Sequence, residues 1–278
     1  MFGKIPNGTG RASGMEDIGI AGLVLSLLLS GSALGLFLQA VLREGHRSRE
    51  TTDAIRLIIG ILVTFTALVL GLVTGAVKSS HDLFDARLRG LAGDVIELDL
   101  RLREYGDAAD TMRTTLRTYV AAAIADTWPG EPRPPGDYPT FSTTGSFERE
   151  ELGTVLFDLD TAIRRLEPTD DFHRKLAEHI ASRMTDLLQQ RWLLVVTPQD
   201  TVSPPLIILM VGWLTIIFTV YGLTSPRNII VYVALAMCAV SISSAVYLIL
   251  DLDKPLEGLI KVSSAPMRNA LHHVEAPK

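Results

Sequence analysis

Four long apolar runs that contain no Asp, Glu, Lys or Arg constrain this chain more than any other feature of its sequence. They cover Ile18–Leu42, Leu57–Val77, Pro204–Leu223 and Ile229–Leu250. Each run reaches the ~20 residues that an α-helix needs to cross a hydrocarbon layer of ~30 Å. In that layer a helix satisfies its own backbone hydrogen bonds, whereas an isolated strand does not. The sequence therefore predicts an all-α membrane protein with four transmembrane helices.

The four runs divide the chain into five parts. We expect a mobile N-terminal tail at 1–17, a transmembrane hairpin at 18–77, an α-helical soluble domain at 78–203, a second hairpin at 204–250 and a C-terminal tail at 251–278. Because the number of crossings is even, both tails and the soluble domain lie on one side of the membrane. Basic residues flank the spans on both sides, so the distribution of Lys and Arg does not decide the orientation.

Charge and cysteine content narrow the range of partners. The soluble domain carries 15 Lys and Arg against 22 Asp and Glu, a net charge of −7. A basic surface is typical of nucleic-acid binding, so nucleic acid is not an expected partner. The one cysteine, Cys238, lies in the fourth span, so neither disulfides nor thiolate metal clusters are expected. We expect no cofactor, and the lipid bilayer is the partner that the sequence does predict.

Helical periodicity continues through the soluble domain. Apolar residues recur at spacings of three and four at Phe84, Leu88, Leu91, Val95, Leu98 and Leu102. No proline separates them from the second span, so we predict one continuous helix over about Leu57–Tyr105. Further helices are predicted at Asp107–Thr127, around Leu152–Ile163 and around Phe172–Leu188. The proline-rich stretch Pro129–Ser146 is predicted to be a loop.

Small residues mark candidate helix-packing positions in the first two spans. Gly31 and Gly35 in the first span, and Gly71 and Gly75 in the second, are each separated by three residues. This small-x-x-x-small pattern is typical of close helix–helix approach in membranes. We therefore predict that both glycine pairs are packing sites.

The second span and its extension carry the candidate pore-lining residues. Thr64, Thr66 and Thr74 fall within a broad sector of one helical face, and hydroxyl groups are suited to lining a pore. Threonine also bonds to its own helix backbone, which is the alternative role. Asp82 and Asp85 follow the span, and carboxylates at a pore mouth would favour cations. The spans contain no charged residue, which argues against an ion-coupled transporter.

Other possible sites are weaker. Asp158 and Asp160 in the sequence VLFDLDTA resemble the first motif of haloacid-dehalogenase-type phosphatases, but that motif needs a strand end, and here it lies in a helical pattern. His81 and Asp85 share a helical face, where a solvated pair is the simpler interpretation than a cation site. No set of His, Asp and Glu has the spacing of metal ligands. We expect no catalytic residues and no enzyme activity.

Three segments together resemble the bestrophin-like domain family of membrane proteins. They are RSRETTDAIRLIIGILVTFTALVLGLVTGAV with DARLRGLAGDVIELD after it, TLRTYVAAAIADTWP, and LDLDKPLEGLIKVSSAPMRNAL after the last span. The last segment is similar to the Asp-x-Pro-Phe-x-Gly ending of the family, with Leu256 in place of the usual Phe. The resemblance covers about Ile18–Leu271. It implies four spans, a cytoplasmic helical domain and cytoplasmic termini, in a bacterial inner membrane.

Two functions remain open on the sequence alone. The first is an oligomeric ion channel or pore, since bestrophins are oligomeric anion channels and the resemblance extends this to inorganic ions here. The acidic Asp82 and Asp85 argue against an anion-selective version. The second is a non-conducting membrane adaptor or sensor, whose helical domain binds a soluble partner through the Pro129–Pro139 segment. Measured ion flux would separate the two functions.

Overall fold

The computed structural model describes residues 10–41, 49–139, 150–196 and 203–276. Within these ranges the chain is helical with short connections, and they contain no strand. The helices are α1 Gly10–Val41, α2 Arg49–Tyr105, α3 Asp110–Thr127, α4 Glu150–Arg164, α5 Asp171–Val196, α6 Pro204–Thr224, α7 Ile229–Leu252 and α8 Ala265–Glu275. A short 3₁₀ helix, Asp107–Ala109, precedes α3. The predicted all-α fold is confirmed.

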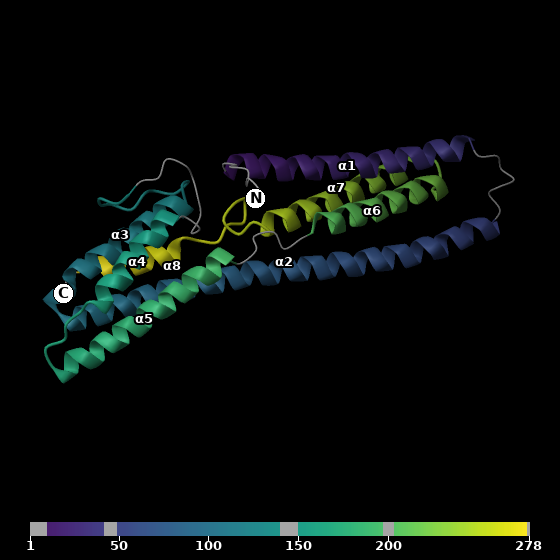
Figure 1. Ribbon diagram of the computed structural model, residues 1–278. Helices are drawn as coiled ribbons and strands as arrows, with labels where there is room; N and C mark the ends of the chain where they lie inside the picture. The colour runs from purple at the N-terminus through teal and green to yellow at the C-terminus, as the bar shows by residue number, and fades with distance from the viewer. Residues whose placement is uncertain (1–9, 42–48, 140–149, 197–202, 277–278) are drawn as a thin grey trace, which may run out of the picture. The chain divides into compact units, whose positions relative to one another are not determined.

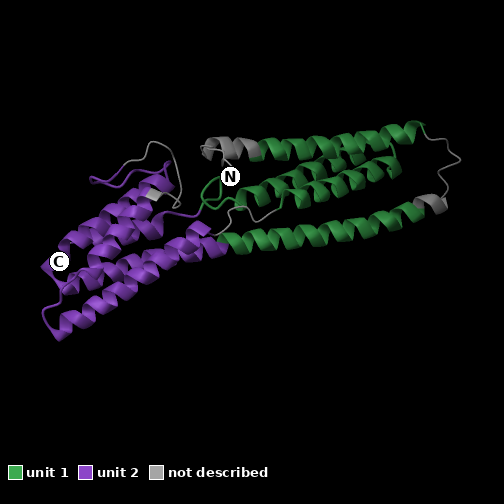
Figure 2. Ribbon diagram, viewed as in Figure 1, with its two compact units in different colours: residues 1–81, 199–261 green, residues 82–198, 262–278 purple. Residues whose placement is uncertain are grey.

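Two compact units make up the fold (Figure 2). The membrane unit comprises residues 1–81 and 199–261, and the polar unit comprises residues 82–198 and 262–278. The boundary falls inside α2, which is helical without a break from Arg49 to Tyr105. The prediction that the second span continues as one helix to Tyr105 is therefore confirmed.

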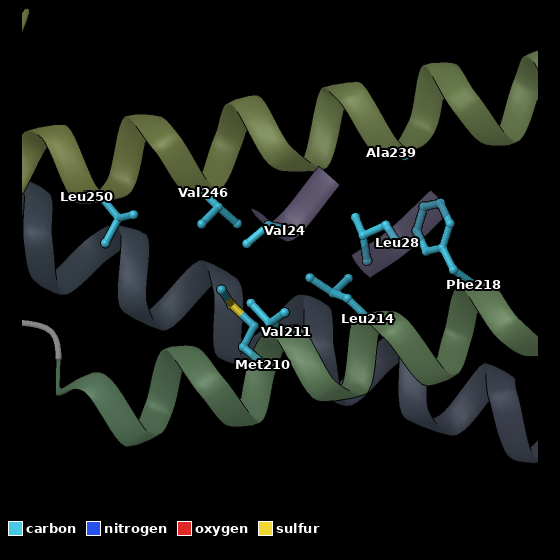
Figure 3. Close-up of a cluster of buried hydrophobic side chains, with 9 residues drawn as sticks. All are labelled: Val24, Leu28, Met210, Val211, Leu214, Phe218, Ala239, Val246 and Leu250. Carbon is cyan, nitrogen blue, oxygen red and sulfur yellow. The ribbon is translucent and has the colours of Figure 1, made fainter. Parts of the chain in front are cut away.

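In the membrane unit, α1 lies beside α6 and α7 (Figure 1). Their common core consists of buried apolar side chains from all three helices (Figure 3): Val24, Leu28, Met210, Val211, Leu214, Phe218, Ala239, Val246 and Leu250. Val73 and Val77 of α2 pack separately with Ile249 of α7. Each of these four helices is long and apolar enough to cross a membrane. The two predicted hairpins thus form one bundle, in which α1 packs on the second hairpin.

The first helix begins earlier than the sequence predicts. α1 starts at Gly10, so residues 10–17 of the expected tail are helical, while residues 1–9 lie outside the described ranges. Asp17, about two turns into this helix, is only 1% exposed and pairs with Lys254 after α7 at 2.8 Å. Assigning residues 10–17 to a mobile tail was therefore wrong, since the helix includes them.

The polar unit contains α3, α4, α5 and α8 with the C-terminal part of α2. α3 packs against α4 and α8, and α4 packs against α5. The predicted apolar seam of α2 is buried, with Leu88, Val95 and Leu102 fully inaccessible. Residues 128–139 contain no helix, as expected for the proline-rich segment, and the rest of that segment lies outside the described ranges.

The C-terminal segment is more ordered than the tail predicted at 251–278. α8 contributes Met267 and Ala270, both fully buried, to the polar unit. The Trp128 indole donates a hydrogen bond to the Val262 carbonyl at 3.0 Å, just before this helix. The buried residues of α8, Met267, Ala270, Leu271 and Val274, follow spacings of three and four, so a helical pattern was present here and the sequence prediction missed it.

Candidate functional site

α2 carries all five predicted pore-lining residues, but they do not share one face. Thr64, Thr74 and Asp82 are exposed in the single chain, and Asp85 is partly buried. Thr66 is only 3% exposed. A helix turns by about 100° per residue, so two residues separate Thr64 and Thr66 by about 160°. The expected common sector is therefore wrong for Thr66, which faces the interior.

Within the membrane unit, α2 presents three distinct faces. The buried face consists of Ile59, Thr66, Val73 and Val77. An exposed face, here called the small-residue stripe, consists of Gly60, Thr64, Gly71 and Thr74. A second exposed face, here called the apolar flank, consists of Ile58, Ile61, Phe65, Leu68 and Leu72, each more than half exposed. By helical rotation no face is wider than about 80°, so each is a coherent strip along the helix.

The hydroxyl groups of the small-residue stripe keep their acceptor capacity. Thr64 Oγ1 donates to the Gly60 carbonyl at 2.9 Å, and Thr74 Oγ1 donates to the Leu70 carbonyl at 2.7 Å. A threonine hydroxyl has one proton but two lone pairs, so each oxygen can still accept a hydrogen bond or contact a cation. The stripe therefore offers polar acceptors on a span that is otherwise apolar.

Charged residues follow the stripe along α2, and both signs are present. Lys78 lies one turn beyond Thr74, and Asp82 lies one turn further. Asp85 pairs with Arg89 one turn on, with 2.9 Å between carboxylate and guanidinium. The two acidic residues thus lie between basic ones, Lys78 before them and Arg89 after them, so the charge at the end of the stripe is mixed.

The two glycine pairs lie in opposite environments. A Cβ on Gly35 would lie 2.7 Å from the Leu223 nitrogen, and one on Gly31 would lie 3.0 Å from a carbonyl oxygen of the same helix, α6. Only glycine permits the approach at position 35. A Cβ on Gly71 or Gly75 would meet no atom within 4 Å. The second pair is open in the single chain.

The remaining sequence candidates do not form a catalytic or metal site in the part of the chain that is described. Asp158 and Asp160 lie on α4 rather than at a strand end, and Asp160 pairs with Arg164 at 2.8 Å. No three His, Cys, Asp or Glu side chains of the described residues gather closely enough to hold a metal ion. His81 and Asp85 lie one turn apart on α2, where Asp85 has Arg89 as its partner.

Asp251 is a buried carboxylate whose role the sequence did not predict. It is fully inaccessible and accepts hydrogen bonds from the Leu259 N–H at 2.8 Å and the Ile260 N–H at 2.9 Å. Gly258 lies against it with a φ of 82°, and a Cβ there would come within 2.8 Å of the Asp251 Cγ. The carboxylate therefore holds the loop after α7 in a conformation that requires glycine.

Buried polar groups are also present inside the polar unit. The Asp99 side chain, 2% exposed, binds Arg103 at 2.6 Å and Arg113 at 2.9 Å. Burial raises the pKa of Tyr119 to about 12, although the nearby Arg191 charge opposes the rise. A fully buried tyrosine is thus held neutral inside this bundle.

The fold and the exposed stripe define an all-α membrane protein whose longest helix combines a span with part of a polar unit. The sequence profile of the bestrophin-like domain matches residues 26–267. That match covers most of the chain, and the chain belongs to the bestrophin-like family. The family expected from the sequence motifs is confirmed.

Solved structures agree with this assignment. Three crystal structures of a bacterial bestrophin homologue from Klebsiella pneumoniae, each with a different mutation, match with TM-scores of 0.61, 0.58 and 0.58 and identities of 12%, 14% and 16%. The matches cover 91% of this chain and 97%, 96% and 96% of the homologue. No curated protein matches. At this level of identity the structural comparisons show a shared fold.

Proposed function

We propose that the protein is an ion channel formed by several copies of this chain, in which each α2 presents its small-residue stripe to a central lumen. The observation that carries the proposal is this stripe of glycine and threonine, exposed on an otherwise apolar span. Membership of the bestrophin-like family and the likeness to a bacterial bestrophin homologue support it. The proposal therefore rests on the helix itself as well as on analogy between folds.

A lumen suits the stripe better than lipid does. Large apolar side chains gain favourable contacts in hydrocarbon, and the apolar flank has them at Ile61 and Leu72, each 66% exposed. Glycine and threonine offer little apolar surface, and acceptors such as Thr64 and Thr74 find no donor among lipid chains. Water and hydrated ions do supply partners for them. The two exposed faces of α2 therefore favour different surroundings.

A single stripe can line only part of a lumen, so the proposed channel is a homo-oligomer. Neighbouring copies of α2 must approach closely for their stripes to meet around a common axis. Gly71 and Gly75 remove side-chain bulk where this approach would occur, and no atom of the chain itself fills that space. The open glycine pair thus fits an intermolecular packing role.

Basic residues on both sides of the two acidic ones weaken any cation preference at the end of the stripe. The helix carries Lys78, Asp82, Asp85 and Arg89 at spacings of three and four. The Asp85–Arg89 pair partly neutralises one carboxylate, and exposed pairs of this kind are screened by solvent. Asp82 is exposed whereas Asp85 is partly buried, so Asp82 is the residue expected to influence ion selectivity most. We place the channel in the bacterial inner membrane, with the polar unit and both termini in the cytoplasm.

The adaptor alternative receives less support from the proline-rich segment. Arg268 of α8 binds Glu131 at 3.0 Å and donates to the Pro132 carbonyl at 2.8 Å. Trp128 binds the Val262 carbonyl just before α8. These contacts hold the start of the proline-rich segment against its own unit. A structural role therefore accounts for this part of the segment, and no soluble partner is needed to explain it.

Ion flux from purified protein in liposomes tests the proposal. Vesicles that contain the protein should show ion flux. Gly71→Leu should reduce this flux strongly, because its side chain would project from the stripe into the lumen. Ile61→Leu, on the apolar flank, should leave flux near the unsubstituted level. Vesicles with verified, correctly assembled protein but no flux above empty vesicles would contradict the channel function and favour an adaptor.

A further inference from the structure

The membrane unit contains an apolar groove that the proposed channel does not use. It has a volume of about 580 Å³ and is lined by α2, α6 and α7. Its walls include Val63, Thr66, Phe218, Tyr221 and Cys238. All of these residues lie within candidate membrane spans, so the medium around the groove is hydrocarbon.

The groove exists because α2 contacts the other helices over only part of its length. Val73 and Val77 pack against Ile249 of α7 and form one closed end. Leu70, which also packs against the α1–α6–α7 core, lies where the groove begins. On the far side of Leu70, towards the turn between α6 and α7, α2 leaves a space between itself and those two helices.

The groove chemistry selects an apolar occupant. Its walls are almost entirely aliphatic and aromatic. The Thr66 hydroxyl, its one threonine group, already donates to the Leu62 carbonyl at 2.8 Å. A polar ligand would lose its hydration there without finding partners, whereas a hydrocarbon chain would lose nothing. Volumes of about 300–1,000 Å³ are typical of ligand sites, and this groove is within that range.

The extent of the groove distinguishes a lipid chain from a helix. On α7 it runs from Ile230 to Ile242, which corresponds to about 18 Å at ~1.5 Å per residue. One leaflet of a ~30 Å hydrocarbon layer is about 15 Å deep. A transmembrane helix from a second copy would need contact across the whole layer. The groove therefore matches a chain that enters from one leaflet.

A basic residue stands in the turn that joins two walls of the groove. Arg227 is exposed between the end of α6 at Thr224 and the start of α7 at Ile229. Tyr221, 44% exposed, lines the groove near this turn. Arginine binds phosphate well, and tyrosine prefers the membrane interface. Phospholipid is the ligand class that combines a phosphate with an apolar chain.

We propose that this groove binds one acyl chain of a phospholipid from the leaflet beside residues 225–228, with its phosphate near Arg227. The proposal depends on the membrane unit alone and goes beyond ion conduction. A bound chain would fill the space between α2 and the α6–α7 pair, and so would support the position of α2 within its own chain. Lipid binding and ion flux are measured separately, so the lipid-site proposal and the channel proposal can each be contradicted without the other.

A phospholipid with a photoreactive diazirine on its acyl chain tests the site in vesicles. After illumination, cross-links mapped by mass spectrometry should concentrate on groove residues, including Cys238, the only cysteine of the chain. Ala234→Phe, inside the groove, should lower these cross-links about tenfold. Ala76→Phe, on an exposed position of α2 outside the groove, should leave them unchanged.

Two results would overturn the proposal. Cross-links spread evenly over all exposed span residues would show bulk lipid contact only. A groove without lipid cross-links, in which a bifunctional thiol-reactive cross-linker joins Cys238 of one copy to Cys238 of another, would show that a second copy occupies it. Both results can be observed with the unsubstituted protein, so lipid binding in the groove can be tested even if Ala234→Phe fails to fold. Arg227→Ala should reduce groove cross-links to phospholipid without abolishing them.

Discussion

The two units achieve tight packing by different means. In the membrane unit, Gly35 lets α1 and α6 come so close that a Cβ would lie 2.7 Å from a backbone nitrogen. In the polar unit, the interior holds polar groups such as Asp99 with its two arginines and the buried Tyr119. Lipid gives helices no hydrophobic reason to associate, so close contact matters most there. Water supplies that driving force in the polar unit, which encloses polar groups along its helices, whereas the buried carboxylates of the membrane unit, such as Asp251, lie outside the apolar runs.

Within the membrane unit, the two glycine pairs have different packing roles. Gly31 and Gly35 have the same spacing as Gly71 and Gly75, yet only the first pair packs inside the chain. The motif therefore specifies close approach but not the partner. The open pair supports assembly between copies, and the packed pair supports the fold of each copy.

The largest effect is expected from Gly35→Leu. Its side chain would overlap the backbone of α6 near Thr219 and Leu223, and the helices would have to separate. We expect a loss of about 3 kcal/mol or more, or no folded protein at all. Thermal unfolding in detergent, followed by circular dichroism, measures it. An unfolding temperature close to that of the unsubstituted protein would show that the packed pair is dispensable.

A pH-dependent loss of stability is expected in the polar unit. The folded pKa of Tyr119 is about 12, above the ordinary value of 10.0. Unfolded chains therefore lose this proton first, so stability is complete below pH ~10 and falls as the pH rises towards ~12. At 1.36 kcal/mol per pKa unit the loss approaches roughly 2–3 kcal/mol. Tyr119→Phe should remove this component, as measured by unfolding at stepped alkaline pH. An identical alkaline profile in both proteins would refute the assignment.

Gly75→Leu should separate assembly from folding. A Cβ at Gly75 would meet no atom of the chain within 4 Å, so the unfolding temperature should change little. We expect a lower oligomer mass by light scattering of the detergent-solubilised protein, corrected for bound detergent. An unchanged mass would count against contact between copies at this pair, and Gly35→Leu serves as the contrasting variant.

The smallest effect is expected from the acidic residues after the span. Asp82→Asn should reduce the ratio of cation to anion permeability by about twofold at low salt, and less at high salt where charges are screened. Asp85→Asn should change it less, because that carboxylate is partly buried whereas Asp82 is exposed. Asp158→Asn, on the exposed surface of α4, is the matched control. Equal effects of all three substitutions would remove Asp82 from the ion path.

Hydropathy and helical period predicted much of this fold, and the reasons for the failures are physical. The four spans and the continuous α2 follow from local patterns. The Asp17–Lys254 pair near the start of α1 joins residues that are far apart in the sequence, so no local pattern predicts it. Asp251 accepts hydrogen bonds from backbone N–H groups of a loop, and a pattern of side chains in the sequence does not predict such bonds. For Thr66 the sequence was sufficient, because helical rotation alone places it about 160° from Thr64.

The central claim is that the small-residue stripe faces a water-filled lumen. Thr74→Cys, in a Cys238→Ala background, places a thiol on the stripe, and Ile61→Cys places one on the apolar flank. A charged, membrane-impermeant thiol reagent should block ion flux through Thr74→Cys vesicles and leave Ile61→Cys vesicles unaffected. Block through Ile61→Cys with no effect on Thr74→Cys would contradict the account, because the lumen would then be lined by the apolar flank.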